Sequence, residues 1–300
     1  MTIAIEFKQD SVNLAEVRIK GSTMELRRSH SISIPEEWID SEGVREEEML
    51  AMLVSQEIKD FDFKSKDLII CVNNPSIIYR ELLVPKVDSK RLGLVVRSEM
   101  MEVLNLTPDY IMDYVVLEEI TDEEGSAKVR LLAVASLSKA VASYIEVAKK
   151  MKLKLVGIDT STNAVLKFVE ASQDLTNNDQ MILVDIGNTH LRLYLFENGK
   201  YVLSRNAKLL PAGASSDYDV AFIVEDHINK MIQFSYTRIN KTGDKIVVLA
   251  GNRDLVNNLK ARVEEDLLVK CDVLMRPDFL KGTADFSSEY INVIGSLIRK

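Results

Sequence analysis

The sequence predicts an α/β protein of two similar lobes, the first of which carries a small α+β insertion. Three observations predict this fold. The order of a three-strand meander, a helix, a strand and a helix occurs twice, at the start of the chain and again from residue 181. A block of strand, helix, two strands and helix at about 76–151 interrupts the first copy. The polar segment 172–180 separates the copies and has the composition of an interdomain linker.

The elements of each part follow from hydrophobic spacing and turn residues. In the first lobe, residues 1–171, we expect strands at 3–7, 13–19, 24–34, 67–73 and 154–159, and helices around 49–58 and at 163–171. In the insertion we expect strands at 76–84, 111–120 and 128–136, and helices at 89–104 and 139–151. In the second lobe, residues 181–300, we expect strands at 181–187, 190–197, 201–209, 245–250 and 271–275, and helices at 219–239, 254–268 and 287–298.

Composition excludes several classes of protein. The 300 residues are 46% hydrophobic and 28% charged, which is typical of a globular protein with about two domains. The net charge of −8 argues against a surface for nucleic acid or anionic lipid. No apolar run approaches the roughly 20 residues of a membrane span, so no membrane insertion is expected. Cys71 and Cys271 lie in apolar strand patterns and are interpreted as reduced core thiols of a cytosolic protein.

Four residues at the end of a predicted strand have the character of a phosphate-binding turn. They are Asp185, Gly187, Asn188 and Thr189. A carboxylate there can face a phosphate or its metal ion, and glycine permits close approach of the backbone. An ordinary hairpin turn explains the same residues. The equivalent turn of the first meander contains Glu6, Lys8 and Ser11 but no glycine, and Lys8 is most simply a surface lysine.

Two further features bear on chemistry. Gly251 and Asn252 join a strand to a helix, where an adenine or a phosphate can rest against the helix start; a plain turn with Asn252 or Asp254 as N-cap explains them equally well. Asp185 and Glu6 are weak candidates for magnesium ligands. The sequence contains no phosphate-binding loop of the GxxxxGK[ST] type and no dinucleotide-binding GxGxxG motif.

Taken in order, several short motifs carry a likeness to a known family. They lie at 79–85, 90–101, 111–114, 131–136, 150–159, 184–199, at Gly251 and at 290–299. The set resembles the actin-like ATPases and, within them, the PilM family of type IV pilus assembly proteins. The resemblance implies an actin-like, ribonuclease H-like duplicated fold, in which 76–151 would be the inserted subdomain called 1C.

The departures from the family pattern concern the nucleotide site. Glu6 and Lys8 stand where the family's first phosphate loop has aspartate and glycine, and Asn252 and Arg253 stand where its adenosine motif has further glycines. The resemblance with these departures implies that ATP and Mg²⁺ bind weakly or not at all. We therefore expect weak or absent ATPase activity and no catalytic residue.

The function implied by the resemblance is that of a cytoplasmic scaffold at the inner membrane. It would bind the N-terminal tail of a PilN-like inner-membrane protein and contact pilus motor ATPases, and a homo-oligomer is left open. We expect the tail in a groove beside helix 90–104 and strand 128–136, with partner-binding residues Arg97, Glu99, Met100 and Met101. The alternatives are an active actin-like ATPase or small-molecule kinase, and the related cytoplasmic domain of a type II secretion protein.

Overall fold

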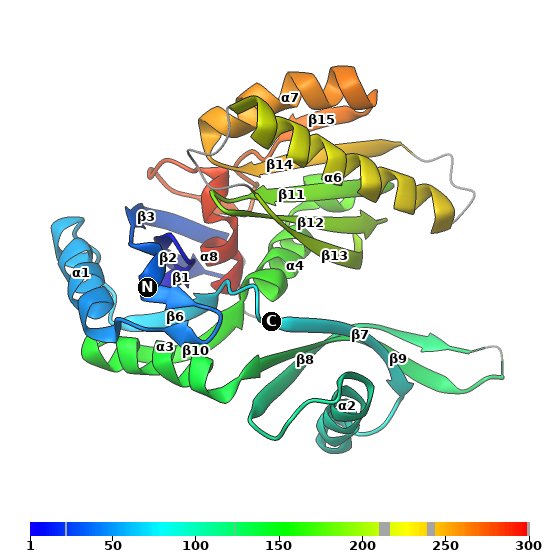
Figure 1. The fold of residues 1–300 in the computed structure, drawn as a ribbon, viewed down its shortest axis with the longest axis horizontal. Coiled ribbons are helices and arrows are strands. Elements are labelled where there is room, and N and C mark those ends of the chain that lie inside the picture. The colour runs from blue at the N-terminus through cyan, green and yellow to red at the C-terminus, as the bar shows by residue number, and fades with distance from the viewer. Residues whose placement is uncertain (22, 123, 210–216, 239–243, 299–300) are drawn as a thin grey trace.

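A computed structural model of the chain describes residues 1–21, 23–122, 124–209, 217–238 and 244–298. Two mixed sheets form two lobes, and a small third sheet lies to one side of the first lobe (Figure 1). Ile239 and Arg299, which end a predicted helix and a predicted motif, lie outside the described residues. Cys71 and Cys271 are buried free thiols, as predicted. Among the described residues, no helix combines the length and hydropathy needed to cross a membrane.

The first lobe is built on a six-stranded sheet whose strand order is β10-β6-β1-β2-β3-β16. Side chains of a strand alternate between the two faces of its sheet. On β1, Ile3, Ile5 and Phe7 therefore face one core, while Ala4 and Glu6 face the other side. The strands are β1 (Thr2–Phe7), β2 (Ser11–Lys20), β3 (Thr23–Ser33), β6 (Asp67–Val72), β10 (Lys154–Thr160) and β16 (Leu280–Lys281), with the short pair β4 (Ile39–Asp40) and β5 (Gly43–Val44) beside them.

The second lobe repeats this plan. Its strand order is β13-β12-β11-β14-β15, which matches β3-β2-β1-β6-β10 of the first lobe and confirms the predicted duplication. The β12–β13 hairpin turns at Asn198 and Gly199, both with positive φ, as the Asn-Gly pair predicts. The elements are β11 (Gln180–Ile186), β12 (His190–Glu197), β13 (Lys200–Lys208), α6 (Asp217–Arg238), β14 (Lys245–Gly251), α7 (Arg253–Leu267) and β15 (Lys270–Val273).

The insertion consists of a three-stranded sheet, ordered β7-β9-β8, with one helix on one face. It contains β7 (Ile78–Pro85), α2 (Ser89–Leu104), β8 (Tyr110–Thr121) and β9 (Ala127–Leu137). The side chain of Asp88 caps α2 by accepting from the backbone N–H groups of Lys90 and Arg91.

The next helix, α3 (Ser138–Lys150), belongs to the first lobe in space. It buries Tyr144 and Val147 in the same core as α1 (Glu47–Asp60), although the predicted insertion at about 76–151 included it. Its amphipathic pattern specified a buried face, but not which sheet covers that face.

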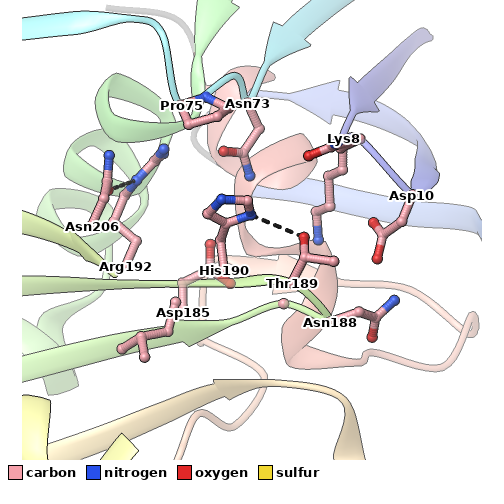
Figure 2. A pocket seen from close by; sticks show the side chains of 13 residues that line it. Lys8, Asp10, Asn73, Pro75, Asp185, Asn188, Thr189, His190, Arg192 and Asn206 are labelled. Atoms are coloured by element: carbon pink, nitrogen blue, oxygen red, sulfur yellow. Dashed lines mark hydrogen bonds between the residues drawn. The ribbon is translucent and has the colours of Figure 1, made fainter. Parts of the chain in front are cut away.

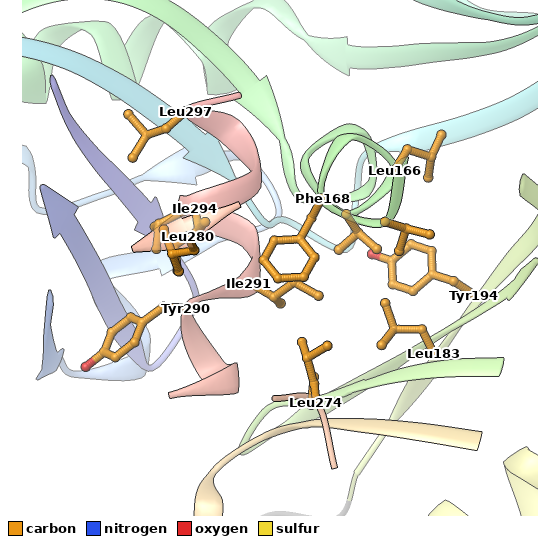
Figure 3. Packing of buried hydrophobic residues seen from close by; sticks show 14 of the residues in the cluster. Leu166, Phe168, Leu183, Tyr194, Leu274, Leu280, Tyr290, Ile291, Ile294 and Leu297 are labelled. Carbon is orange, nitrogen blue, oxygen red and sulfur yellow. The ribbon is translucent and has the colours of Figure 1, made fainter. Parts of the chain in front are cut away.

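Two helices fill the space between the lobes. They are α4 (Ser161–Ala171), which the short α5 (Gln173–Thr176) follows, and α8 (Ile291–Ser296). Figure 3 shows Phe168 of α4 and Ile291 of α8 close to Leu183 and Tyr194 of the second lobe, within one continuous buried cluster. The segment leading to α8 returns to the first sheet, where β16 pairs with β3. Residues after about 280, assigned to the second lobe by sequence, thus pack on the first.

The contact between α4 and α8 depends on Gly295. A Cβ atom at this position would lie 2.1 Å from the carbonyl oxygen of Ala164, which is a backbone atom of α4 and has little room to move. Gly295→Ala should therefore push the helices apart and lower the free energy of unfolding by about 1–3 kcal/mol. Urea denaturation measures this change.

The matched control is Gly157→Ala in β10, where no atom lies within 4 Å of the new Cβ and φ is not in the left-handed region. We expect that variant to unfold within about 0.5 kcal/mol of the wild type. Equal effects of the two substitutions would contradict the close approach of α4 and α8.

Candidate functional site

Glu6 and Asp185 occupy equivalent positions in the two lobes. Each lies near the end of the first strand of its meander, and each stands opposite the residue seven positions later, Asn13 on β2 and Arg192 on β12. The following turns also match: Lys8 donates its backbone N–H to the carbonyl of Ser11, and Gly187 donates its N–H to the carbonyl of His190. The duplication therefore brings one carboxylate from each lobe to the junction.

Asn292 of α8 joins these two carboxylates. Its Nδ2 donates to Oε1 of Glu6 at 2.8 Å and to Oδ2 of Asp185 at 2.9 Å, and all three side chains are buried. Glu6 accepts two more amide hydrogen bonds, from Asn73 at 2.8 Å and Asn13 at 3.3 Å. These hydrogen bonds stabilise the negative charge of a carboxylate that has no exposed surface.

Lys8 supplies the positive charge in this cluster. Its Nζ lies 3.6 Å from Oε2 of Glu6, and its side chain is only 17% exposed. Burial raises the pKa of Glu6, and the charge of Lys8 opposes that rise. Burial alone would lower the pKa of Lys8, but the carboxylates of Glu6 and Asp185 outweigh it and raise that pKa. Lys8 is thus an internal counter-ion, which corrects its interpretation as a surface lysine.

The contacts of Glu6 do not suit a metal ion. A carboxylate offers about four lone-pair sites; three amides donate to Glu6, and the ammonium of Lys8 lies 3.6 Å from its Oε2. Magnesium needs oxygen ligands at about 2.0–2.1 Å in octahedral geometry, and the nearby ammonium repels it. Within the described ranges, no three His, Cys, Asp or Glu side chains gather closely enough to hold a metal ion. Glu6 therefore does not fit the role of magnesium ligand.

The turn residues are partly engaged within their own hairpins. The Ser11 hydroxyl donates to Oδ1 of Asp10 at 2.9 Å, and Oγ1 of Thr189 lies 2.9 Å from Nδ1 of His190. The turn itself favours glycine at position 187, because a Cβ there would lie 3.1 Å from the carbonyl oxygen of His190. Of the predicted turn, Asn188 and Thr189 face open space beside the hairpin.

Gly251 and Asn252 have structural roles at the start of α7. A Cβ on Gly251, whose φ is +137°, would lie 2.3 Å from the carbonyl oxygen of Ile186 on the neighbouring strand. Asn252 is the N-cap of α7, since its side chain accepts from the N–H groups of Asp254 and Leu255. Both observations agree with the simpler interpretation of this junction.

Two cavities meet at the hairpins. A cleft of about 830 Å³ lies between the turn at Gly187–Thr189 and the helices α6 and α7, with Asn252 on its wall. A smaller cavity of about 60 Å³ continues from it past Lys8 and Asp185 to Arg192 (Figure 2). Arg192 donates to Oδ1 of Asn206 and to the hydroxyl of Ser161 on α4, so it ties the second lobe to the first. Gly187, Asn188, Thr189 and Asn252 thus line the larger cleft, and Lys8 and Asp185 line the smaller cavity, whereas Glu6 and Ser11 line neither.

A second groove, of about 280 Å³, lies between the insertion and the first lobe. Residues 111–115 of β8 form one wall, and Ile158, Asp159 and Thr160 of β10 form the other. In the part of the chain that the structure describes, β8 and β10 are edge strands of their sheets, and runs of successive residues from both line the groove. The remaining walls come from β9, α3 and the start of α4.

The residues predicted to bind a partner lie on the other face of the insertion. Met100 is buried in the core between α2 and the three-stranded sheet, so it has no surface to offer. Arg97, Glu99 and Met101 are half-buried on the same helix. Strand β9 lines the groove through Leu132, Val134 and Ser136, as expected of strand 128–136, but α2 does not line it. The alternation of β9 side chains separates the two faces, and spacing in sequence did not reveal which face the groove occupies.

A scan of protein families matches residues 4–213 to the model of the type IV pilus assembly protein PilM. The chain belongs to the PilM family. The match covers well over half of the chain and includes the first lobe, the insertion and the second meander. No curated protein matches the sequence.

Similar solved structures agree with this assignment and show the fold. The structure of a PilM–PilN type IV pilus biogenesis complex has a TM-score of 0.83 at 17% identity, with 98% of this chain and 96% of that chain covered. The ethanolamine utilization protein EutJ from Carboxydothermus hydrogenoformans has a TM-score of 0.53 at 9% identity, covering 98% and 87%. A Bacteroides thetaiotaomicron protein with an actin-like ATPase fold has a TM-score of 0.50 at 10% identity, covering 91% and 90%. The predicted actin-like fold is confirmed.

The carboxylate cluster predicts that the free energy of unfolding depends on Asn292. Asn292→Leu removes a donor from both Glu6 and Asp185, and a buried acceptor left without a partner costs about 1–3 kcal/mol. We expect the variant to lose about 2–4 kcal/mol of unfolding free energy at pH 7. Because burial raises the pKa of Glu6, protonation relieves the buried charge, and the deficit should shrink as the pH falls toward 4.5.

Asn257→Leu serves as the control, because Asn257 is exposed on α7. Urea titrations of both variants at pH 7 and pH 5 provide the comparison. A deficit of the Asn292 variant that stays constant or grows at low pH would contradict the role assigned to the carboxylates.

Proposed function

We propose that the chain is a cytoplasmic component of a type IV pilus assembly machine that binds the N-terminal tail of a PilN-like inner-membrane protein in an extended form. The observation that carries this proposal is the groove between the free edges of β8 and β10. The protein would lie at the inner membrane through this partner and contact motor ATPases from there.

Two open strand edges suit an extended peptide. An edge strand presents N–H and C=O groups without partners, and an incoming strand gains main-chain hydrogen bonds from them. Here the edges of two different sheets line the same groove, so one peptide can contact the insertion and the first lobe together. The similar structure described as a PilM–PilN complex supports this choice of partner.

The side chains of the groove indicate what kind of peptide fits. Ile111 is 45% exposed and Ile158 is 38% exposed, and both line the groove, one from each wall. Apolar side chains of a peptide would cover them, at a gain of roughly 1.5–3 kcal/mol for each large side chain that becomes fully buried. Asp159 on the β10 wall is paired with Lys167 at 2.7 Å, whereas Asp113 on the β8 wall is exposed and forms no ion pair with a described residue. A peptide with alternating apolar residues and no acidic side chain near Asp113 suits these walls.

We also propose that the nucleotide site is degenerate. Lys8 takes the place of a glycine and pairs with Glu6, and Glu6 already accepts hydrogen bonds from three amides. Phosphoryl transfer on this fold depends on phosphate-binding N–H groups, a metal ion and a positioned base. The 830 Å³ cleft is the observation that favours the alternative function, an active ATPase or small-molecule kinase.

The groove is tested by titrating a synthetic peptide with the N-terminal tail sequence of a PilN-like protein into the full chain. Ile111→Glu and Ile158→Glu each place a charge against the bound peptide, and we expect each to weaken binding at least tenfold, about 1.4 kcal/mol. Leu94→Glu is the matched control, because Leu94 is 70% exposed on α2, behind the same sheet. Isothermal titration calorimetry measures all three.

The helix α2 is tested in the same titration by Arg97→Ala and Met101→Glu. Weakening by these variants, with Ile111→Glu and Ile158→Glu unchanged, would move the docking site to α2 and reject the groove between β8 and β10.

The nucleotide site is tested by thermal melting with Mg²⁺ and ATP. A ligand at 100 times its dissociation constant adds about 2.7 kcal/mol, and we expect the wild type to gain far less at millimolar ATP. Lys8→Gly removes the internal cation and should increase the shift, provided that Mg²⁺ is present. A shift of several degrees in the wild type, lost in Asp185→Ala, would support the ATPase alternative instead.

A further inference from the structure

A groove with basic walls lies on the outer side of the first lobe. It has a volume of about 650 Å³ and separates the exposed side of α1 from the end of α3. Its floor is apolar and contains Ala51, Met52 and Met151. Met52 is 70% exposed, although it lies between residues that pack inward. Methionine surfaces of this kind adapt to the shape of a partner.

The charge of this groove differs from that of the whole chain. Four lysines and one glutamate line it, on a protein whose net charge is −8. Lys150 pairs with Glu48, while Lys59, Lys66 and Lys152 form no ion pair with any described residue. An exposed methionine, Met52, beside lysines without ion pairs among the described residues suits an acidic segment that carries an apolar side chain.

The end of α7 on the second lobe has this character. Glu265 and Asp266 are exposed in its last turn and form no ion pair with described residues. Leu268, which follows the helix in a left-handed conformation, is 90% exposed. The nearby Lys260 and Lys270 are both engaged by Asp272, so the end of α7 remains acidic.

We propose that the basic groove of one molecule binds the acidic end of α7 of a second copy of this chain, with Leu268 placed over Met52. Each surface lacks a counterpart among the residues that the structure describes, and each matches the other in charge and polarity. Figure 1 places α1 and α3 on the outer side of the first lobe and α7 on the outer side of the second. The contact therefore joins two different surfaces, and it can add further copies head to tail.

Sedimentation velocity of the full chain at several concentrations in 50 and 500 mM NaCl tests this contact. We expect the average sedimentation coefficient to rise with concentration at low salt only, because ion pairs at the surface are screened by salt. Lys59→Glu/Lys66→Glu and Glu265→Lys/Asp266→Lys should each abolish that rise. Lys20→Glu/Lys90→Glu changes the net charge as much as the groove variant does, at exposed sites elsewhere, and should leave the rise intact.

Mixing the two charge-reversed variants distinguishes this contact from a symmetric one. Each variant alone carries a groove and an α7 end of the same charge and should stay monomeric. The mixture pairs grooves and α7 ends of opposite charge and should associate again, as should a chain with both surfaces reversed. Circular dichroism melts confirm that each variant is folded.

Two outcomes would overturn the proposal. One is a wild type that stays monomeric at every concentration in low salt, and the other is association that the charge reversals do not change. If the wild type is monomeric and the groove variant alone loses binding to phosphatidylglycerol vesicles, the groove serves an anionic membrane surface and self-association is rejected.

Discussion

The arrangement of the two lobes depends on how two buried carboxylates are kept at their junction. Glu6 and Asp185 occupy equivalent positions, so the duplicated fold forces them to approach each other. Two negative charges in a buried site repel strongly and are poorly solvated. The amide of Asn292 donates to both, and Lys8 adds a positive charge beside Glu6. The site is thereby neutralised in large part by the chain's own groups.

This arrangement connects the packing of the core with the chemistry of the cleft. Asn292 can reach both carboxylates only because α8 lies between the lobes, packed on α4. Gly295 permits that packing, and Lys167 of α4 donates to the carbonyl oxygens of Ser296 and Ile298 at the end of α8. The same two helices bury the apolar surfaces of both sheets. A change in their spacing would therefore disturb the core and the cleft together.

The groove between the insertion and the first lobe depends on a different feature, the edge strands of two separate sheets. In sequence, the insertion lies between β6 and β10, which are neighbours in the first-lobe sheet. Its own sheet therefore lies beside the edge of the first-lobe sheet without pairing to it. Arg130 of β9 donates to the carbonyl oxygen of Tyr201 at 2.6 Å, and Lys200 pairs with Glu118, so the insertion is also attached to the second lobe. The insertion, which carries the edge strand β8, is thus attached to both lobes.

The sequence by itself determined the local elements, the duplication and the family. Strands and helices followed from hydrophobic periodicity, which is a local property, and the hairpin at Asn198 and Gly199 followed from backbone preferences of those two residues. Asp185 and Glu6 were found because they end equivalent strands. Their shared partner was not, because Asn292 is 107 residues from Asp185 and 286 from Glu6, and an isolated asparagine in a helix has no distinguishing pattern.

Only the tertiary structure decided which faces meet. The sequence could not show that α3 and the last residues pack on the first lobe, because an amphipathic helix specifies a buried face and not its neighbour. It could not place Lys8 inside the cluster or Met100 inside the core, because burial depends on what packs above a residue. Nor could the net charge reveal that four lysines from separate segments line one groove, since folding, not composition, sets the distribution of charge over a surface.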